Sequence, residues 1–260
     1  MTYYAGIDVG SLSAEAVVID DGEKIVSYAI LPTGNNSQKA GSDAFVNALG
    51  QAGISSEDVA GVISTGYSRG RVLEAGNSKT EITCHARGAF YIYPRVGTII
   101  DIGGQDSKAI RVGKAGRVTN FSMNDKCAAG TGRFLEVMAG ALEVPLDMMD
   151  HLAFQSQENF TISSICTVFA ESEVVSLISQ GKAPADISMA VIRAIVRRTA
   201  GLATRVGVVD RVVMTGGVAK NRAVVDMLSE EIGHEIAVPE EPQIVGALGA
   251  ALLAREEMVA

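Results

Sequence analysis

Two cysteines stand at positions where a reactive thiol is expected. Cys127 lies in a glycine-rich stretch, residues 124–133, ahead of a helix predicted to start near residues 131–133, and Cys166 directly precedes a helix predicted over about residues 167–180. The free N–H groups and the positive dipole at the start of a helix lower the pKa of a thiol and stabilise an anionic group. These positions favour redox or metal chemistry.

The number of cysteines points the other way. Two cysteines in one chain are most often buried, inert thiols, and this pair does not have the CxxC spacing of a metal site. Two thiolates are also too few for a closed zinc or iron–sulfur site. A two-fold homodimer would bring four cysteines from two chains to one site on the axis, so the metal-binding alternative requires a dimer.

A second set of residues suits the binding of phosphate and magnesium. Asp8 and Asp101 each end an apolar strand pattern and precede a glycine turn. Glycine lets backbone N–H groups approach phosphate oxygens without a Cβ atom in the way. An aspartate repels phosphate but can hold a hydrated magnesium ion that bridges phosphates. Ser11 and Ser13 can donate hydroxyl hydrogen bonds, and Gln105 can orient water or phosphate.

The two turns belong to an internal repeat. Residues 6–19 align without a gap on residues 99–112, and each copy continues into a glycine-containing turn and a further strand, at 24–28 and 117–121. This order predicts two antiparallel hairpins, and a duplicated ancestor would place their turns face to face across a cleft. A chance recurrence of two Asp-x-Gly turns in a glycine-rich chain is the less favoured alternative.

The intervening segments predict an α/β protein. A helix is expected over residues 43–52, strands over 59–64 and 211–215, and a last helix after Pro242. The glycine turn at 214–218 opens a helix and suits an adenosine moiety. Apolar residues on one helical face are predicted at Phe134, Met138, Ala141 and Leu142, and again at Ile187, Val191, Ala194 and Ile195, while Met138, Met148 and Met149 are expected to be core residues.

Composition narrows the function classes. The chain has 260 residues, a formal net charge of −8 and three cysteines. An acidic chain without a basic stripe argues against a nucleic-acid partner. Three cysteines form no disulfide framework, and no apolar run is long enough to span a bilayer, so a cytoplasmic protein without membrane contact is expected.

Six stretches together resemble one known family. The chain looks like the ATP-dependent activator (component A) of 2-hydroxyacyl-CoA dehydratases, in the BadF/BadG/BcrA/BcrD ATPase family, within the superfamily of acetate and sugar kinases, heat-shock chaperones and actin. The nucleotide turns resemble the wider superfamily, and the cysteine stretches resemble the activators. The stretches are 6–11 (GIDVGS), 65–67 (TGY), 101–106 (DIGGQD), 124–134 (NDKCAAGTGRF), 166–173 (CTVFAESE) and 214–219 (MTGGVA).

The resemblance implies a fold of two similar actin/ribonuclease-H-like domains with a nucleotide cleft between them. Domain I would hold residues 1–95 and 243–260, and domain II residues 96–242. The implied nucleotide contacts are Gly10, Ser11, Leu12, Ser13, Ala14, Gly103, Gly104, Gly216, Gly217, Lys220 and Gln243, with Asp8, Asp101, Gln105 and Asp106 as catalytic residues.

It also implies the cofactors and partners. Cys127 and Cys166 match the family's ligands of one 4Fe–4S cluster, two from each subunit of a homodimer. Asp8 and Asp101 would hold Mg²⁺ through water, and Gln105 and Asp106 would contact the γ-phosphate of ATP and the attacking water. The activator would take an electron from ferredoxin or flavodoxin and, on hydrolysing ATP to ADP, pass it to the dehydratase (component D).

One residue departs from the pattern. Family activators carry a lysine in the first hairpin where this chain has Glu15, whereas the equivalent place in the second hairpin is Lys108. The change removes a cation from the phosphate side of the first turn.

Other functions remain as alternatives. Residues 124–125 resemble the loop that carries the general base of some sugar kinases, and Asp125 would then deprotonate the hydroxyl of an N-acetylhexosamine-like acceptor. An activating ATPase of a benzoyl-CoA-reductase-type enzyme and a nucleotide-sensing module without turnover are the others.

Three further groups receive structural interpretations. Cys84 is expected to be structural, and His85 to be a surface or packing residue. Glu171 and Glu173 are expected to be helix caps or interface charges rather than catalytic acids.

Overall fold

The computed structural model describes residues 2–162, 166–209 and 211–259. The chain divides into two compact units. Unit 1 comprises residues 1–99, 112–119 and 239–260, and unit 2 comprises residues 100–111 and 120–238. Each unit is described by itself.

The first sheet has five strands in the order β3-β2-β1-β4-β5. Strands β1 and β2 pair antiparallel with Asp8 opposite Glu15, and β1 pairs parallel with β4, where Asp8 lies opposite Thr65. The strands are β1 (Tyr3–Val9), β2 (Ser13–Asp20), β3 (Ile25–Pro32), β4 (Val59–Thr65) and β5 (Asn77–Ser78).

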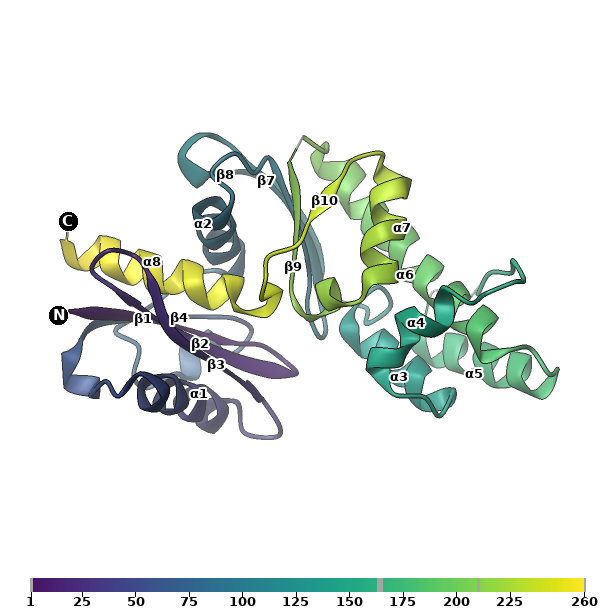
Figure 1. Cartoon of the computed structure of the whole chain (residues 1–260), viewed down its shortest axis with the longest axis horizontal. Coiled ribbons are helices and arrows are strands. Elements are labelled where there is room, and N and C mark those ends of the chain that lie inside the picture. The colour runs from purple at the N-terminus through teal and green to yellow at the C-terminus, as the bar shows by residue number, and fades with distance from the viewer. Residues whose placement is uncertain (1, 163–165, 210, 260) are drawn as a thin grey trace. The chain divides into compact units, whose positions relative to one another are not determined.

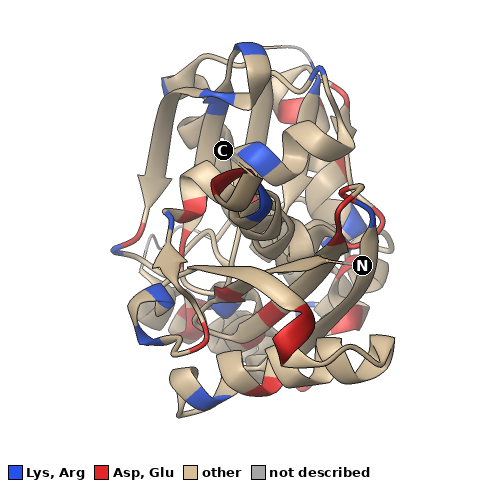
Figure 2. Ribbon diagram, turned by 90° about the vertical axis from the view of Figure 1, so that its left-hand side faces the viewer, with Lys and Arg blue, Asp and Glu red and all other residues tan. Residues whose placement is uncertain are grey.

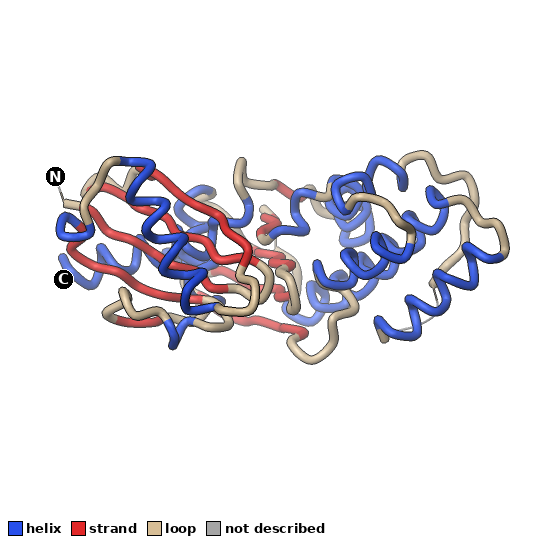
Figure 3. Tube along the Cα trace, turned by 90° about the horizontal axis from the view of Figure 1, so that it is seen from below, coloured by secondary structure: helices blue, strands red, loops and turns tan. Residues whose placement is uncertain are grey.

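Helices cover both faces of the first sheet. Helix α1 (Ser37–Ala52) packs on one face, where its Phe45 meets Ile7 and other alternate residues of β1 and β2. Helix α8 (Val245–Val259) packs on the other face, next to α2 (Glu81–Ile92). Gly6 makes close packing possible, because a Cβ there would lie 2.0 Å from the Ala247 carbonyl oxygen. Figure 3 shows α1 lying along the strands of this unit.

The second sheet repeats the order of the first. Its five strands run β10-β9-β6-β7-β8, so β6, β7, β8, β9 and β10 occupy the places of β1 to β5. The predicted duplication is therefore confirmed in the strand order (Figure 1). The strands are β6 (Thr98–Ile102), β7 (Ser107–Val112), β8 (Val118–Asn124), β9 (Val212–Thr215) and β10 (Ile236–Ala237).

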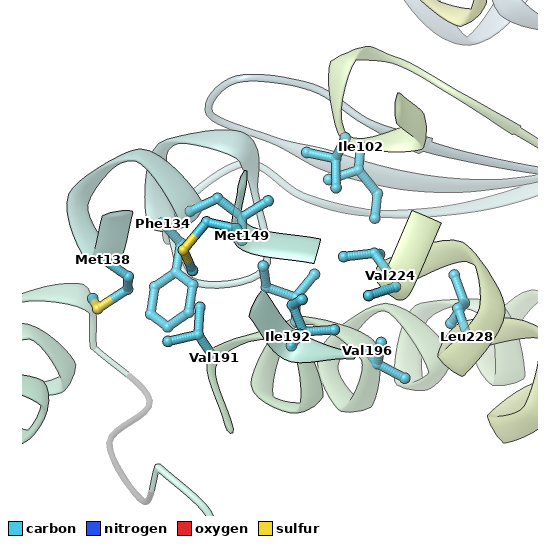
Figure 4. Close-up of a cluster of buried hydrophobic side chains, with 14 of the residues drawn as sticks. Ile102, Phe134, Met138, Met149, Val191, Ile192, Val196, Val224 and Leu228 are labelled. Atoms are coloured by element: carbon cyan, nitrogen blue, oxygen red, sulfur yellow. The ribbon is translucent and has the colours of Figure 1, made fainter. Parts of the chain in front are cut away.

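The connection between the third and fourth strands distinguishes the two copies. In the first copy it carries α1, whereas in the second copy it carries a group of helices and both cysteine stretches. That group comprises α3 (Gly132–Ala141), α4 (Met149–Ala153), α5 (Thr167–Ser179) and α6 (Pro184–Val206), and α7 (Arg222–Ile232) follows β9. These helices pack around a core in which Phe134, Met138, Met149 and Ile192 are fully buried (Figure 4).

Short 3₁₀ turns link several of these elements. The last of them, Pro242–Ile244, leads directly into α8, so the final helix follows Pro242 as predicted. The others lie at Ser56–Asp58, Arg69–Arg71, Lys114–Gly116, Leu146–Met148 and Gly217–Lys220. No helix in the described ranges is long and apolar enough to cross a membrane.

Two local predictions need correction. Helix α1 begins at Ser37 rather than at residue 43, because the Asn36 side chain accepts a hydrogen bond from the Lys39 N–H and caps a first turn that has no apolar periodicity. Met148 is 41% exposed and does not belong to the core, because it lies in a 3₁₀ turn just before α4.

Candidate functional site

The first predicted phosphate turn follows β1 and is held by backbone hydrogen bonds. The Gly10 N–H donates to the Ser13 carbonyl oxygen at 2.9 Å. Thr33 fixes the turn from the end of β3, since its hydroxyl donates to the Gly10 carbonyl oxygen and its N–H to that of Leu12, both at 2.9 Å. Gly10, Ser11, Leu12 and Ser13 remain partly exposed. The turn is thus fixed in shape while its outer side stays reachable.

Asp8 is buried on the α8 face of the sheet, at the end of β1. Two glycines make room for its carboxylate. A Cβ on Gly66 would lie 2.4 Å from Asp8 Oδ1, and a Cβ on Gly246 would lie 2.1 Å from Oδ2. A Cβ on Gly246 would also lie 3.1 Å from His85 Nε2, so the buried His85 is a neighbour of Asp8.

The second turn reproduces the first. The Gly103 N–H donates to the Asp106 carbonyl oxygen at 3.0 Å, which matches the bond between Gly10 and Ser13. The carbonyl oxygens of Gly103 and Gly104 accept hydrogen bonds at 2.8 Å from the N–H groups that begin α3. This turn is therefore tied to the start of a helix as well as to its own strands.

Asp101 sits in a buried polar cluster. Lys108 Nζ, whose residue is 2% exposed, lies 3.2 Å from Asp101 Oδ2 and 2.7 Å from Asp106 Oδ1. The Thr215 hydroxyl donates to Asp101 Oδ1 at 2.9 Å. Both oxygens of Asp101 thus accept hydrogen bonds from the protein.

A Thr–Gly pair stands at the end of the fourth strand in each copy, Thr65–Gly66 for β4 and Thr215–Gly216 for β9. Gly66 has φ +93° and Gly216 has φ +84°, values that favour glycine. A Cβ on Gly66 would lie 2.5 Å from the Val9 carbonyl oxygen, and one on Gly216 would lie 2.4 Å from that of Ile102. The backbone of each first strand therefore passes close to the end of the fourth.

Sequence reasoning predicts Gly216 as a site residue but not Gly66, Gly246 or His85. The shared Thr–Gly pattern after β4 and β9 is a sequence signal that could have found Gly66. Gly246 and His85 carry no comparable signal, because they reach Asp8 from two other segments of the chain.

The same position carries opposite charge in the two copies. Asp8 lies opposite Glu15 in the β1–β2 register, and both residues are buried. In the second copy, the aligned Asp101 pairs with Lys108. The departure at Glu15 therefore places two carboxylates where the second turn has an ion pair.

The remaining predicted nucleotide residues have varied settings. Gln243 Nε2 lies 3.4 Å from Ser13 Oγ, which brings Gln243 to the first turn. Ala14 is buried on the α1 face, so its side chain belongs to the core and only its backbone is left for a ligand. The predicted residues that are exposed are Gln105, Gly217 and Lys220.

The two cysteines differ in position. Cys166 is exposed and is the residue before the first turn of α5, as predicted. Cys127 is half-buried, and its carbonyl oxygen accepts a 2.8 Å hydrogen bond from Asn124 Nδ2. Thr131 rather than Cys127 precedes α3, so the helix-dipole argument applies to Cys166 alone. Within the described residues, no group of three or more His, Cys, Asp or Glu side chains could hold a metal ion.

The other cysteine and the nearby acids have structural settings. Cys84 is fully buried in α2, and burial raises the pKa of its thiol to about 12. It is inert at neutral pH, as expected for a structural residue. Glu171 and Glu173 lie beyond the first turn of α5, which contains no acidic residue, so neither caps that helix. Glu171 is exposed and Glu173 half-buried.

The repeated strand order and the paired Asp–Gly turns define a nucleotide-binding α/β protein with two actin-like halves. The comparisons agree with this class. The family model of the BadF/BadG/BcrA/BcrD ATPase family matches residues 5–254, and the chain belongs to that family.

Similar proteins extend over the full chain. An activator of lactoyl-CoA dehydratase from Anaerotignum propionicum is 47% identical over 254 residues, which are 98% of each protein. The solved structure of component A of (R)-2-hydroxyglutaryl-CoA dehydratase from Acidaminococcus fermentans matches with a TM-score of 0.96 at 45% identity and covers 100% of both chains. The activator of 2-hydroxyisocaproyl-CoA dehydratase from Clostridium difficile with bound ADPNP matches with a TM-score of 0.94 at 43% identity, over 99% and 96% of the two chains. The predicted fold and family are confirmed.

Proposed function

We propose that this protein is the ATP-hydrolysing activator of a partner 2-hydroxyacyl-CoA dehydratase, to which it delivers one electron at low potential. The observation that carries the proposal is the combination of a duplicated phosphate-turn pair with two reachable thiols in one unit. Full-length similarity to proteins named as dehydratase activators supports it and favours it over the sugar kinase with Asp125 as base. The activating ATPase of a benzoyl-CoA-reductase-type enzyme belongs to the same chemistry.

The nucleotide is assigned to the two turns and the adenosine turn. Asp8 and Asp101 would organise Mg²⁺ through water, since Asp101 already accepts hydrogen bonds at both oxygens. Gln105 is exposed in the second turn, where it could orient the attacking water beside Asp106. The proposed nucleotide contacts are those predicted from the sequence. Gly66 and Gly246 are added because they leave space for the Asp8 carboxylate.

The two thiols fit a cluster shared between two chains. Cys127 and Cys166 are both accessible, in contrast to Cys84, and one chain supplies too few thiols to ligate a 4Fe–4S cluster. Val168 and Phe169 lie two and three residues after Cys166 and are 66% and 68% exposed, which provides an apolar surface for a second copy. When bound, the cluster would supply a one-electron redox centre. We therefore propose a homodimer with one 4Fe–4S cluster held by Cys127 and Cys166 of each chain.

The remaining assignments follow from this role. Ferredoxin or flavodoxin would supply the electron, and the partner would be component D of the dehydratase. The protein would work in the cytoplasm, without nucleic-acid or membrane partners. We also propose the domain bounds 1–95 with 243–260 and 96–242.

Two variants separate the proposed roles. Asp101→Asn should abolish ATP hydrolysis and leave the visible spectrum of the anaerobically purified protein unchanged, because Asp101 lies at the second turn and not at the cysteines. Cys166→Ala should remove the visible spectrum while nucleotide binding persists. Asp226→Asn, at an exposed ion pair with Arg222 on α7, is the control and should change neither. Loss of both properties in either variant would contradict this division of roles.

A further inference from the structure

A cavity in unit 2 gathers three arginines. It has a volume of about 290 Å³, and Arg193, Arg197 and Arg198 of α6 contribute to its lining. Arg193 and Arg197 lie four residues apart, on one face of the helix, and Arg198 adjoins them. Arg197 is exposed, and Arg193 and Arg198 are half-buried. Three guanidinium groups are thus directed toward the same region.

The positive charge of this cavity is not neutralised by its own lining. Arg193 donates a hydrogen bond to Asn159 Oδ1, which is uncharged. In the part of the chain that the structure describes, no hydrogen bond or ion pair engages the guanidinium groups of Arg197 and Arg198. Among the same described residues, no carboxylate lines the cavity. Such a site attracts anions, and guanidinium groups pair especially well with carboxylates. The other lining residues are Ala129, Gly130, Phe134, Thr161, Ile162, Ala190 and Ala194.

The cavity lies beside both cysteine stretches. Gly130 follows Cys127 by three residues, and Ile162 precedes Cys166 by four residues. The reach of an extended chain limits these Cα separations to about 11 and 14 Å. Arg198 packs against the first stretch, since its Cδ would lie 3.0 Å from a Cβ on Gly130. An anion in the cavity would therefore sit close to both thiols.

We infer that this arginine cavity is the docking site for the electron donor, an acidic one-electron redox protein that inserts surface carboxylates between Arg193, Arg197 and Arg198. The inference rests on the proposed function. In the transfer, the donor is oxidised by one electron and this protein is reduced by one. The chain as a whole has a net charge of −8, and Figure 2 shows acidic and basic residues interspersed, whereas the lining of this cavity contributes three arginines.

Unit 2 has two surfaces of different chemistry, an apolar face on α5 and the arginine cavity, which suit different kinds of partner. The exposed face of α5 carries Val168, Phe169, Val175 and Ile178, an apolar set that suits a lasting contact. Short-lived electron-transfer encounters use small interfaces, and complementary charge raises their association rate. The arginine cavity matches the second kind of contact, which favours the donor over the dehydratase as its occupant.

The test compares two double variants of the anaerobically purified protein. Arg197→Gln/Arg198→Gln removes two charges from the cavity, and Arg205→Gln/Arg222→Gln removes two exposed charges elsewhere in unit 2. Equilibrium binding of an oxidised acidic ferredoxin and the rate of reduction by the photoreduced ferredoxin are measured against chloride concentration. Reduction by dithionite and ATP hydrolysis are measured in parallel.

We expect the cavity variant to weaken ferredoxin binding and slow its reduction by roughly tenfold or more at low salt, with a flatter salt dependence. Dithionite reduction and ATP hydrolysis should not change, and the control should change less than about twofold. Arg198→Lys should lose much less ferredoxin binding than the cavity variant because it keeps the charge.

Equal losses in the two double variants would overturn the inference. So would a specific block of ferredoxin binding by phosphate at constant ionic strength, which would assign the cavity to a small anion, or a defect confined to dehydratase activation with dithionite as reductant. A protein without visible spectrum or iron would instead refute the proposed function itself.

Discussion

The two copies of the strand–turn–strand repeat share a backbone and differ in charge. Each has a buried aspartate just before the last residue of its first strand, closes its turn with the same glycine hydrogen bond, and makes room for the aspartate with a Thr–Gly pair. Opposite that aspartate, the first copy has Glu15 and the second has Lys108. The shared features preserve the shape of the turn, whereas the charge at the paired position differs between the copies.

The copies differ again in the connection between their third and fourth strands. A single helix, α1, covers the sheet of the first copy on that side. The second copy inserts α3 to α6, which build their own core and carry Cys127 and Cys166 in their flanking segments. The strand–turn–strand features are thus duplicated, whereas the two accessible cysteines belong to one copy.

Removal of Lys108 should have the largest effect on stability. Lys108→Met leaves Asp101 and Asp106 without their shared cation, and loss of one member of a buried ion pair costs about 3–5 kcal/mol. Urea unfolding at neutral pH measures the change, with Lys114→Met, at an exposed lysine, as the control. A loss below about 1 kcal/mol in the free energy of unfolding would contradict a stabilising role for the buried Lys108 ion pairs, which the first copy lacks.

Both Thr–Gly pairs should be intolerant of a side chain. Gly66→Ala and Gly216→Ala each combine a positive φ with a backbone clash, and we expect each to lower the free energy of unfolding by about 2–3 kcal/mol. Gly233→Ala has a similar φ of +69° but open space around it, so it should cost only about 1 kcal/mol. If Gly66→Ala behaved like Gly233→Ala while Gly216→Ala did not, the two strand ends would not be equivalent.

Giving the first copy the lysine of the second should stabilise the protein modestly. Glu15→Lys places a cation opposite Asp8, and exchange of a like-charge for an opposite-charge cross-strand pair should raise the free energy of unfolding by about 1 kcal/mol. Glu231→Lys on the exposed face of α7 makes the same charge change and should have little effect. Urea unfolding of both variants measures the difference, and a destabilised Glu15→Lys protein would show that the first copy is built around the acid.

The smallest effect concerns the inserted helices and depends on pH. The N–H groups of Glu158 and Gln157 and the Ser156 hydroxyl donate to Asp186 Oδ1 and hold the pKa of that carboxyl below its usual value. Because the folded pKa is the lower one, this stabilisation is complete above the unfolded pKa of about 3.9 and is lost as the pH falls through the folded value.

Asp186→Asn should therefore remove this pH dependence. Hydrogen exchange at the Gln157 and Glu158 amides should quicken by roughly tenfold at most near neutral pH, with the amides of α1 as internal reference. Unchanged exchange at both amides would show that Asp186 does not hold the segment ahead of Cys166.

Local sequence patterns are enough to predict the repeat and its turns. The alignment of residues 6–19 with 99–112 predicts two hairpins with Asp8 and Asp101 at equivalent places, and both follow from strand pairing alone. The start of α1 does not follow from the same patterns, because a side-chain cap and not apolar periodicity sets it.

The other differences require the packed structure. Gly66, Gly246 and His85 come from three separate segments, and only the approach of β4, α2 and α8 to β1 brings them to Asp8. Helix α3 starts at Gly132, as predicted, but the hydrogen bonds from its first N–H groups to the carbonyl oxygens of the second turn could not be predicted from local patterns. Contacts between distant segments such as these leave no periodic signal in the sequence.

The content of iron and acid-labile sulfide in the anaerobically purified protein shows whether Cys127 and Cys166 of two chains hold one cluster. We expect about four of each per two chains in the unaltered protein and in Cys84→Ala, and loss of both in Cys127→Ala and Cys166→Ala. Absence of iron from protein made in cells that load other clusters well, or full retention of iron by the Cys127→Ala/Cys166→Ala double variant, would contradict it.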